Sequence, residues 1–219
     1  MKMMSLVVMV MLAVASTAGA LDTGDISLPA PRMEGGKPLL QALRARQSTR
    51  TFAGKKLPLQ LLSDLLWAAA GINRPGSGKR TAPSARNWQE VEVYAVVPEG
   101  AYRYDAKANS LRMVARGDFR KLAGTQAYAA AVPLNLVYVA DSAKMAGVTA
   151  PGEQAFYSGA DTGFISQNVY LFCASEGLAT VVRASVDRTA LGAALKLTGR
   201  QKITLVQSVG YPEAPERRE

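Results

Sequence analysis

Residues 153–177 read EQAFYSGADTGFISQNVYLFCASEG, about seven helical turns without an internal proline. Spacings of three and four predict one helix face for Phe156, Gly159, Ala160, Gly163, Phe164, Gln167, Tyr170, Leu171 and Ala174. A helix-interior glycine costs about 1 kcal/mol relative to alanine, so Gly159 and Gly163 indicate that another backbone passes close by. A second apolar stripe runs through Ile165, Val169, Phe172 and Cys173. Two interpretations stay open: a core helix of a monomer, or a helix whose glycine side meets its symmetry mate in a homodimer.

The first twenty residues combine Lys2, an apolar run from Met3 to Val14 and small residues ending at Ala20. This pattern is typical of a secretory signal peptide, and its apolar run is short for a bilayer span. We therefore expect cleavage after Ala20 and export, to the periplasm in a Gram-negative host, with no membrane span afterwards; an uncleaved anchor is the alternative. Residues 21–36 are expected to form an extended leader, and residues 37–219 one domain. Cys173 is the only cysteine, so an intrachain disulfide is excluded.

The composition excludes several kinds of catalytic site. The chain has 26 Lys and Arg against 17 Asp and Glu, and it has no histidine. A Ser-His or Cys-His couple, a histidine metal ligand and a cysteine zinc site are therefore all absent. An enzyme of this composition needs a cofactor to carry its reaction. The positive charge favours an anionic small ligand, whereas nucleic-acid binding is disfavoured because the basic loop has no aromatic platform apart from Trp88.

A basic segment follows a short predicted helix that carries Leu39, Leu40 and Leu43. Its polar residues are Arg44, Arg46, Gln47, Ser48, Thr49 and Arg50. Guanidinium groups bind phosphate oxygens bidentately, and hydroxyls add short hydrogen bonds, so the segment is suited to clamp a phosphate. The alternative is a solvated helix end whose arginines complement the helix dipole.

The rest of the chain alternates strand and helix patterns. A helix beginning near Pro58 and ending at Gly71 precedes a polar, basic loop over residues 72–90, a length that is usually functional or disordered. Strands are predicted over residues 91–97, 101–105, 110–114, 132–140, 178–184 and 202–210, the second and third forming a hairpin. Asp118 is expected to cap a helix through Leu122 toward Tyr128, and Asp187 a helix through Leu195. This order predicts an α+β fold with one mixed sheet.

Several of these stretches resemble one family. Residues 46–52, RQSTRTF, are similar to the opening R-x-S-x-R-x-F motif of nitroreductase-like FMN-dependent flavoproteins, and residues 83–85 to their Pro-Ser-Ala loop. The order of the later segments is also similar: a Tyr-Arg-Tyr-Asp hairpin, an Ala-Val-Pro strand, a long helix ending in Glu-Gly-Leu-Ala-Thr, and a last strand closing on residues 209–212, VGYP. The hairpin most resembles the SagB-type dehydrogenase branch. The resemblance spans residues 40–212, and it implies a central mixed, mostly antiparallel sheet surrounded by helices, with the long helix at a homodimer interface.

The resemblance also implies non-covalent FMN and a set of residues that hold it. Arg46, Ser48 and Arg50 would hold the ribityl chain and phosphate, with Gln47 alongside. Pro83, Ser84, Ala85, Arg86 and Asn87 would reach the flavin of the other subunit. Val181, Val182, Arg183 and Ala184 would run along the isoalloxazine with backbone groups near N5. Gln126 is a candidate for the pyrimidine edge, and Arg217 or Arg218 for a return to the phosphate.

Two positions depart from the family pattern. Gln47 stands where many relatives have arginine or histidine, and Trp88 lies in a loop that usually continues differently. Trp88 either shapes the substrate side or anchors the loop to the core.

The mechanism that the resemblance implies belongs largely to the flavin, so no catalytic side chain is named. Hydride would enter at N5, and a second substrate would leave with the electrons in ping-pong fashion. Quinones, nitroaromatics or another small molecule would be the substrate. The reductant is NAD(P)H or another donor. The alternative is a flavin-binding protein without turnover.

Overall fold

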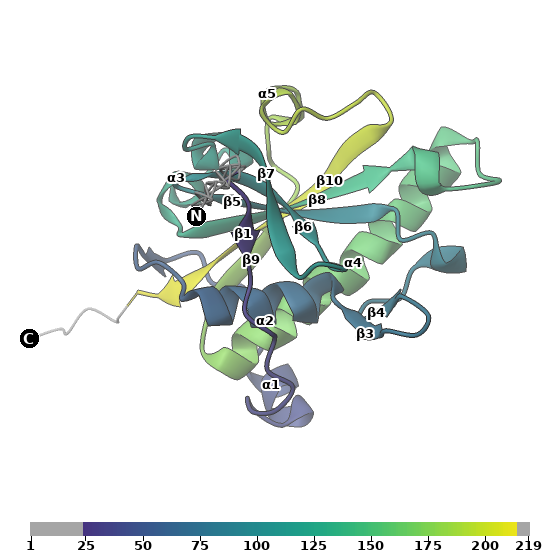
Figure 1. Cartoon of the computed structure of the whole chain (residues 1–219). Coiled ribbons are helices and arrows are strands. Elements are labelled where there is room, and N and C mark those ends of the chain that lie inside the picture. Colours follow the sequence, from purple (N-terminus) through teal and green to yellow (C-terminus); the bar gives the residue numbers. More distant parts are fainter. Residues whose placement is uncertain (1–23, 214–219) are drawn as a thin grey trace, which may run out of the picture.

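The computed structural model describes residues 24–213, which form an eight-stranded sheet with helices on both faces (Figure 1). The strands are β1 (Ile26–Ser27), β2 (Phe52–Ala53), β5 (Val91–Val97), β6 (Gly100–Asp105), β7 (Ser110–Arg116), β8 (Leu134–Asp141), β9 (Ala179–Arg183) and β10 (Gln201–Pro212). Their order is β1-β7-β6-β5-β8-β10-β2, and β9 pairs with β10 outside this path. The predicted, mostly antiparallel sheet is confirmed, and the pairings between these strands are all antiparallel.

Strand β8 is the centre of the sheet because it pairs with β5 on one side and β10 on the other. Its residues from Leu134 to Ala140 are all buried, which explains why the sequence there is apolar without alternation except at Asn135. Strand β10 is the longest, and its register shifts between Ile203 and Val206. Beyond that irregularity it pairs with β8 and β9 at once, which brings β9 beside the core of the sheet.

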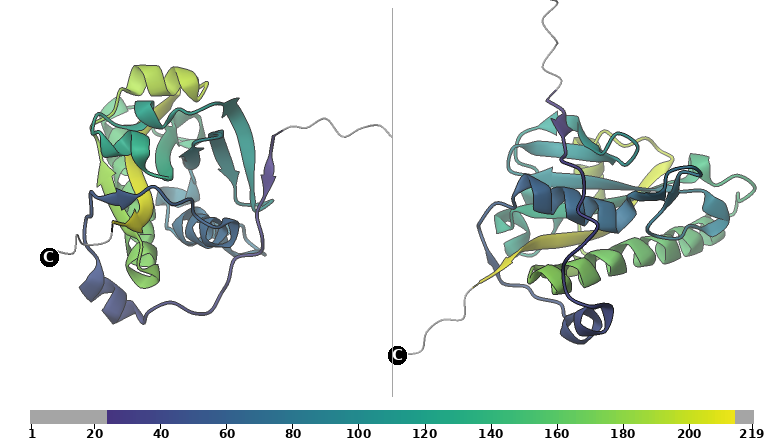
Figure 2. Two further views of the ribbon diagram at one scale, coloured as in Figure 1. Left: turned by 90° about the vertical axis from the view of Figure 1, so that its left-hand side faces the viewer. Right: turned by 60° about the horizontal axis from the view of Figure 1, so that its bottom comes forward.

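Helices cover both faces of the sheet (Figure 2). They are α1 (Leu39–Ala45), α2 (Leu59–Ala70), α3 (Tyr128–Ala131), α4 (Pro151–Glu176) and α5 (Arg188–Ala194), with short 3-10 turns η1 (Ala85–Asn87), η2 (Arg120–Ala123) and η3 (Ser142–Lys144). On one face, Leu66 of α2 and Val169 of α4 pack against Tyr138 of β8. On the other face, Leu191 of α5 packs with Val137 and Val206.

The long helix α4 confirms the prediction for residues 153–177. It begins at Pro151 and ends before Gly177, whose left-handed φ of 71° stops the helix. The second apolar stripe enters the core. On the first face Tyr170 is buried, whereas Phe156 is 71% exposed and Phe164 46% exposed. A Cβ atom added at Gly159 or Gly163 would meet nothing within 4 Å. A helix buried on all sides within a monomer is therefore the wrong interpretation for the glycine stripe.

Two other predictions need correction. The expected continuous helix from Asp118 toward Tyr128 is wrong, because the chain forms η2, becomes extended at Gly124 with φ 174°, and resumes as α3. Asp118 caps only the first of these turns, since its carboxylate accepts from the backbone N–H of Arg120 at 3.1 Å. The predicted loop over residues 72–90 contains the two-stranded hairpin β3 (Ile72–Arg74) and β4 (Lys79–Arg80) as well as η1.

The described part of the leader crosses the molecule in extended form and contributes only β1, in which Ile26 pairs with Leu111. The predicted signal peptide over residues 1–20 lies outside the described residues. Within residues 24–213, no helix is long and apolar enough to cross a bilayer.

Candidate functional site

The basic segment of residues 46–50 lies beside the edge of β9 that faces away from β10. The backbone N–H of Thr49 donates to the carbonyl of Thr180 at 2.9 Å. Oγ of Ser48 lies 2.8 Å from the hydroxyl of Tyr170, and that hydroxyl accepts from the backbone N–H of Val182 at 3.0 Å. The structure therefore brings two predicted site segments, residues 46–50 and residues 181–184, to one edge and joins them through α4.

The two predicted clamp arginines have no acidic partner among residues 24–213. Arg50 is exposed, and the Arg46 guanidinium lies 5.3 Å from the centre of the Tyr170 ring. A cavity of about 190 Å³ beside them is lined by Lys37, Gln47 and Thr49, and no carboxylate lines it. Cationic and hydroxyl donors without a competing acid are the chemistry that binds a phosphate. The other predicted phosphate contacts, Arg217 and Arg218, lie outside the described residues.

The residues at the end of β9 differ in how far they are buried and in where their side chains point. Val181 is buried, Val182 is half-buried and Ala184 is exposed. The side chain of Arg183 points into the sheet, where Nη1 donates to Oγ of Ser208 at 2.7 Å. Burial lowers the pKa of this guanidinium, although arginine stays charged in proteins. Arg183 can therefore offer only its backbone at the strand edge.

Gln126 lies in the connection between η2 and α3, which is joined to the end of β9. Oγ1 of Thr125 is 3.0 Å from Oγ of Ser185, two residues beyond Arg183. Gln126 is half-buried, and its Oε1 atom is buried without a hydrogen-bond partner in the described part of the chain. The predicted pyrimidine-edge residue thus stands in a segment next to the β9 edge, with one acceptor left to be satisfied.

The predicted loop of residues 83–87 is held elsewhere, against the first half of α4. The backbone N–H of Ala85 donates to the Asp161 carboxylate at 2.9 Å, and the Ser84 hydroxyl donates to Glu90 at 3.2 Å. Arg86 and Asn87 are exposed with left-handed φ values of 49° and 57°. Asp161, which holds this loop, precedes Tyr170, which contacts the basic segment, by nine residues, or about 14 Å along the helix. Within one chain, the loop and the basic segment are therefore apart.

Trp88 anchors this loop to α4. Its ring meets that of Tyr157 edge-on at 5.5 Å, and the Arg86 guanidinium lies 5.3 Å from the Trp88 ring. Of the two roles expected for Trp88, the described residues show the packing one.

Sequence reasoning missed two buried carboxylates under the same loop, Glu90 and Asp161, which are 0% and 3% exposed. Burial, reinforced by the charge of Asp161, raises the pKa of Glu90. Oε1 of Glu90 has no hydrogen-bond partner among the residues that the structure describes. One signal for Asp161 was available in the sequence, because it is the only charged residue between Glu153 and Glu176 of a long helix.

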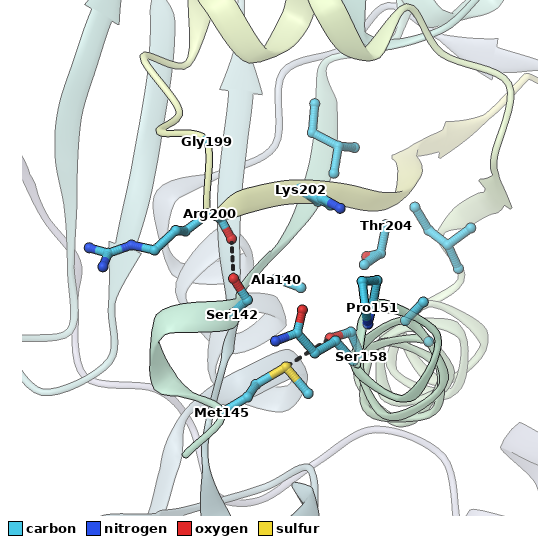
Figure 3. Close-up of a pocket in the computed structure, with 14 residues that line it drawn as sticks. Ala140, Ser142, Met145, Pro151, Ser158, Gly199, Arg200, Lys202 and Thr204 are labelled. Carbon is cyan, nitrogen blue, oxygen red and sulfur yellow. Dashed lines mark hydrogen bonds between the residues drawn. The ribbon is translucent and has the colours of Figure 1, made fainter. Parts of the chain in front are cut away.

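A larger cavity, of about 470 Å³, lies where the first half of α4 approaches the end of β8 and the start of β10 (Figure 3). Met145, which follows η3, lines it together with Ser158 and Gly159 of α4 and Lys202 and Thr204 of β10. No predicted site residue lines this cavity. Its Gly159 side is continuous with the exposed stripe of α4, so the cavity and the stripe form one surface.

Comparison with known proteins adds independent findings. The sequence matches the model of the nitroreductase family over residues 43–211. A candidate nitroreductase of Methanocaldococcus jannaschii is 32% identical over 171 residues, covering 73% of this chain and 83% of that protein. The crystal structure of a candidate nitroreductase of Ralstonia eutropha has a TM-score of 0.82 at 39% identity, covering 87% of this chain and 90% of the other. The NADPH:FMN oxidoreductase of Vibrio harveyi, solved with NAD+, shares the fold at a TM-score of 0.60 and 20% identity, covering 80% and 69%.

Proposed function

Because the chain belongs to the nitroreductase family, we propose that it is an FMN-dependent oxidoreductase that passes electrons between a donor and a small organic substrate. The observation that carries the proposal is the basic segment of residues 46–50, which lies along the edge of β9 that faces away from β10 and whose arginines form no ion pair within residues 24–213. Members of this family typically bind FMN, an anionic cofactor whose phosphate needs such donors.

The residues present fit FMN. Arg46, Ser48 and Arg50 would hold the phosphate and ribityl chain, with Gln47 at the cavity beside them. The backbone of residues 181–184 would run along the isoalloxazine, and the unpaired Oε1 of Gln126 would accept from a ring N–H. FMN, when bound, supplies the two-electron redox chemistry. The protein orients it and places cationic and N–H groups where negative charge develops, so no side chain of this chain is required as an acid or base.

A homodimer forms part of the proposal. The exposed stripe of α4 continues onto α1, where Leu39 is 62% exposed and Leu40 is 78% exposed. Contiguous exposed apolar surface of this kind marks protein interfaces, and a two-fold axis pairs the same surface on two chains. The loop of residues 83–87 would then serve the flavin of the partner subunit, which accounts for its distance from the basic segment of its own chain.

The finer parts of the proposal rest on the sequence. We propose export through the signal peptide of residues 1–20, with the periplasm as the compartment in a Gram-negative host. The β6–β7 hairpin supports a place near the SagB-type branch. Turnover would be ping-pong, with quinones or nitroaromatics as acceptors, and the scarcity of NAD(P)H outside the cytoplasm favours another reductant. The alternative, a flavin-binding protein without turnover, differs only in whether bound FMN cycles.

The test begins with the absorption spectrum of the purified protein. Bands of oxidised flavin are expected, and denaturation should release FMN into the supernatant. Bound flavin should then be reduced by NADH, NADPH or dithionite and reoxidised by menadione or nitrofurazone. Flavin that is reduced by dithionite but never reoxidised by an acceptor would favour the non-catalytic alternative. A colourless protein that also ignores added FMN would overturn the proposal.

A further inference from the structure

Arg183 is a buried cation without an acidic partner. Its side chain is 8% exposed, and none of the ion pairs within residues 24–213 includes it. Burying a charge is costly unless a group of opposite charge compensates it, so buried charges in proteins are normally paired. Arg183 is an exception to this rule, because no carboxylate within residues 24–213 compensates its charge.

The surroundings of Arg183 are shaped for a guanidinium. Nη2 donates to the carbonyl of Ala123 at 2.6 Å and to Oδ1 of Asn135 at 2.8 Å, and the group lies 5.5 Å from the centre of the Tyr128 ring. A Cβ atom added at Gly124 would come within 2.5 Å of Nε, so the absence of a side chain there makes room for the arginine. All of these partners are neutral, and Nε has no hydrogen-bond partner within residues 24–213. The positive charge therefore stays uncompensated within this shell.

The position of Arg183 along the chain links this charge to the proposed cofactor. It is the last residue of β9, and the backbone N–H of its neighbour Val182 points away from β10, toward the Tyr170 hydroxyl and the basic segment. Two electrons and one proton added to oxidised FMN leave one negative charge on its ring system. A fixed cation in a poorly solvated position stabilises such a charge more strongly than water-exposed cations do.

We propose that Arg183 is an electrostatic residue that favours reduced over oxidised FMN at the edge of β9. The inference rests on the proposed function, because it requires FMN beside this strand. It makes no use of hydrogen bonds between the guanidinium and the cofactor, since Nη1 and Nη2 are already bound to Ser208, Ala123 and Asn135. The positive charge acts on the flavin through space. The preference for reduced FMN should therefore depend on a positive charge at position 183 and not on the hydrogen-bond geometry of the side chain.

The test measures the two-electron midpoint potential of FMN bound to the full-length protein by anaerobic dithionite titration against a reference dye. Arg183→Met removes the charge and keeps an unbranched apolar side chain, and Arg183→Gln also removes it but keeps an amide donor. Both should weaken binding of reduced relative to oxidised FMN at least tenfold, a fall in potential of about 30 mV. Arg183→Lys should keep most of the wild-type potential.

Arg188 provides the matched control. It also donates to backbone carbonyls, those of Ile203 and Thr204, and also lacks an acidic partner among residues 24–213, but it is exposed. Arg188→Met should leave the potential unchanged. Equal potentials in wild type and either neutral variant, with FMN bound to both, would overturn the role of Arg183 and leave the proposed function standing. A wild-type protein that binds no FMN would instead overturn both.

Discussion

The hydroxyl oxygen of Tyr170 lies 2.8 Å from Oγ of Ser48 and accepts the backbone N–H of Val182 at 3.0 Å. One buried side chain on α4 therefore connects the basic segment with the strand edge along which FMN is proposed to lie. The ring of the same tyrosine also supports the Arg46 guanidinium. The arrangement of the site thus depends on the core helix, although Ser48 and Arg50 themselves are exposed.

Replacing Tyr170 with phenylalanine should weaken both the fold and the site. The Val182 N–H would lose its partner, which costs about 1–3 kcal/mol of the free energy of unfolding, measured by urea denaturation. FMN affinity, measured by quenching of flavin fluorescence, should also fall, because Ser48 is no longer held. Tyr157→Phe is the control, since within residues 24–213 the Tyr157 hydroxyl has no hydrogen bond and only its ring packs. Equal FMN affinity in Tyr170→Phe and wild type would contradict this coupling.

The double variant Arg46→Ala, Arg50→Ala should release FMN without unfolding the protein. Each charge-assisted contact contributes about 1.5–3 kcal/mol, so the dissociation constant should rise at least about a hundredfold. Equilibrium dialysis with FMN measures it. Arg44→Ala, which removes an exposed arginine from the last turn of α1, should change affinity little. Unchanged flavin occupancy in the double variant would mean that the phosphate binds elsewhere.

The sequence predicted those parts of the fold that periodicity controls. The length of α4, the strands through β8 and β10, and the Asp187 cap of α5 follow from local patterns, and the structure contains them. At Gly124, where the predicted helix breaks, the close approach of Arg183 is a tertiary contact between residues distant in sequence, which a local pattern does not specify.

The same reason limits the prediction of the site. Segments 46–50 and 181–184 were predicted separately, but their connection through Tyr170 is a tertiary contact. The direction of the Arg183 side chain follows from the pairing of Arg183 with Val206, which a local pattern does not specify. The Glu90–Asp161 pair likewise joins the residue before β5 to a helix about seventy residues later, and no local spacing reveals it.

Phe164→Glu should convert a dimer into a monomer. Phe164 is 46% exposed on the α4 stripe, and a charge there would be buried without a partner at a two-fold interface. Sedimentation equilibrium gives the mass. Leu59→Glu is the control, because Leu59 is 44% exposed but lies at the start of α2, away from the stripe. A wild-type monomer, or a dimer that survives Phe164→Glu, would contradict the proposed interface.

Cys173 should be unreactive in the native protein. Its thiol is fully buried between α4 and the sheet, and burial raises its pKa well above the ordinary value, so the reactive thiolate is scarce. Labelling with 5,5′-dithiobis(2-nitrobenzoic acid) should be slow in buffer and reach one thiol per chain in concentrated urea. Rapid, complete labelling without denaturant would show that α4 opens locally. We expect no such opening, because Cys173 lies in the same core cluster as Val169 of α4 and Tyr138 of β8.

Glu90 should make the protein less stable as the pH rises. Burial, reinforced by Asp161, raises the pKa of Glu90 in the folded state above its ordinary value, so the folded chain holds this proton more tightly than the unfolded chain. The contribution of this proton to the free energy of unfolding is fully present below the pKa of Glu90 in the unfolded chain, and it is lost as the pH rises through the pKa in the folded chain. Urea denaturation across the range from acidic to alkaline pH measures this slope.

Glu90→Gln should flatten the slope and stabilise the protein at the alkaline end, because an amide cannot ionise and can donate to Asp161. Asp161→Asn should only reduce the slope, since burial is the larger cause of the raised pKa and it remains. The Ala85 N–H can still bond to the asparagine oxygen in that variant, so the loop of residues 83–87 keeps its anchor. A slope in Glu90→Gln as steep as that of wild type would assign the pH dependence to other groups.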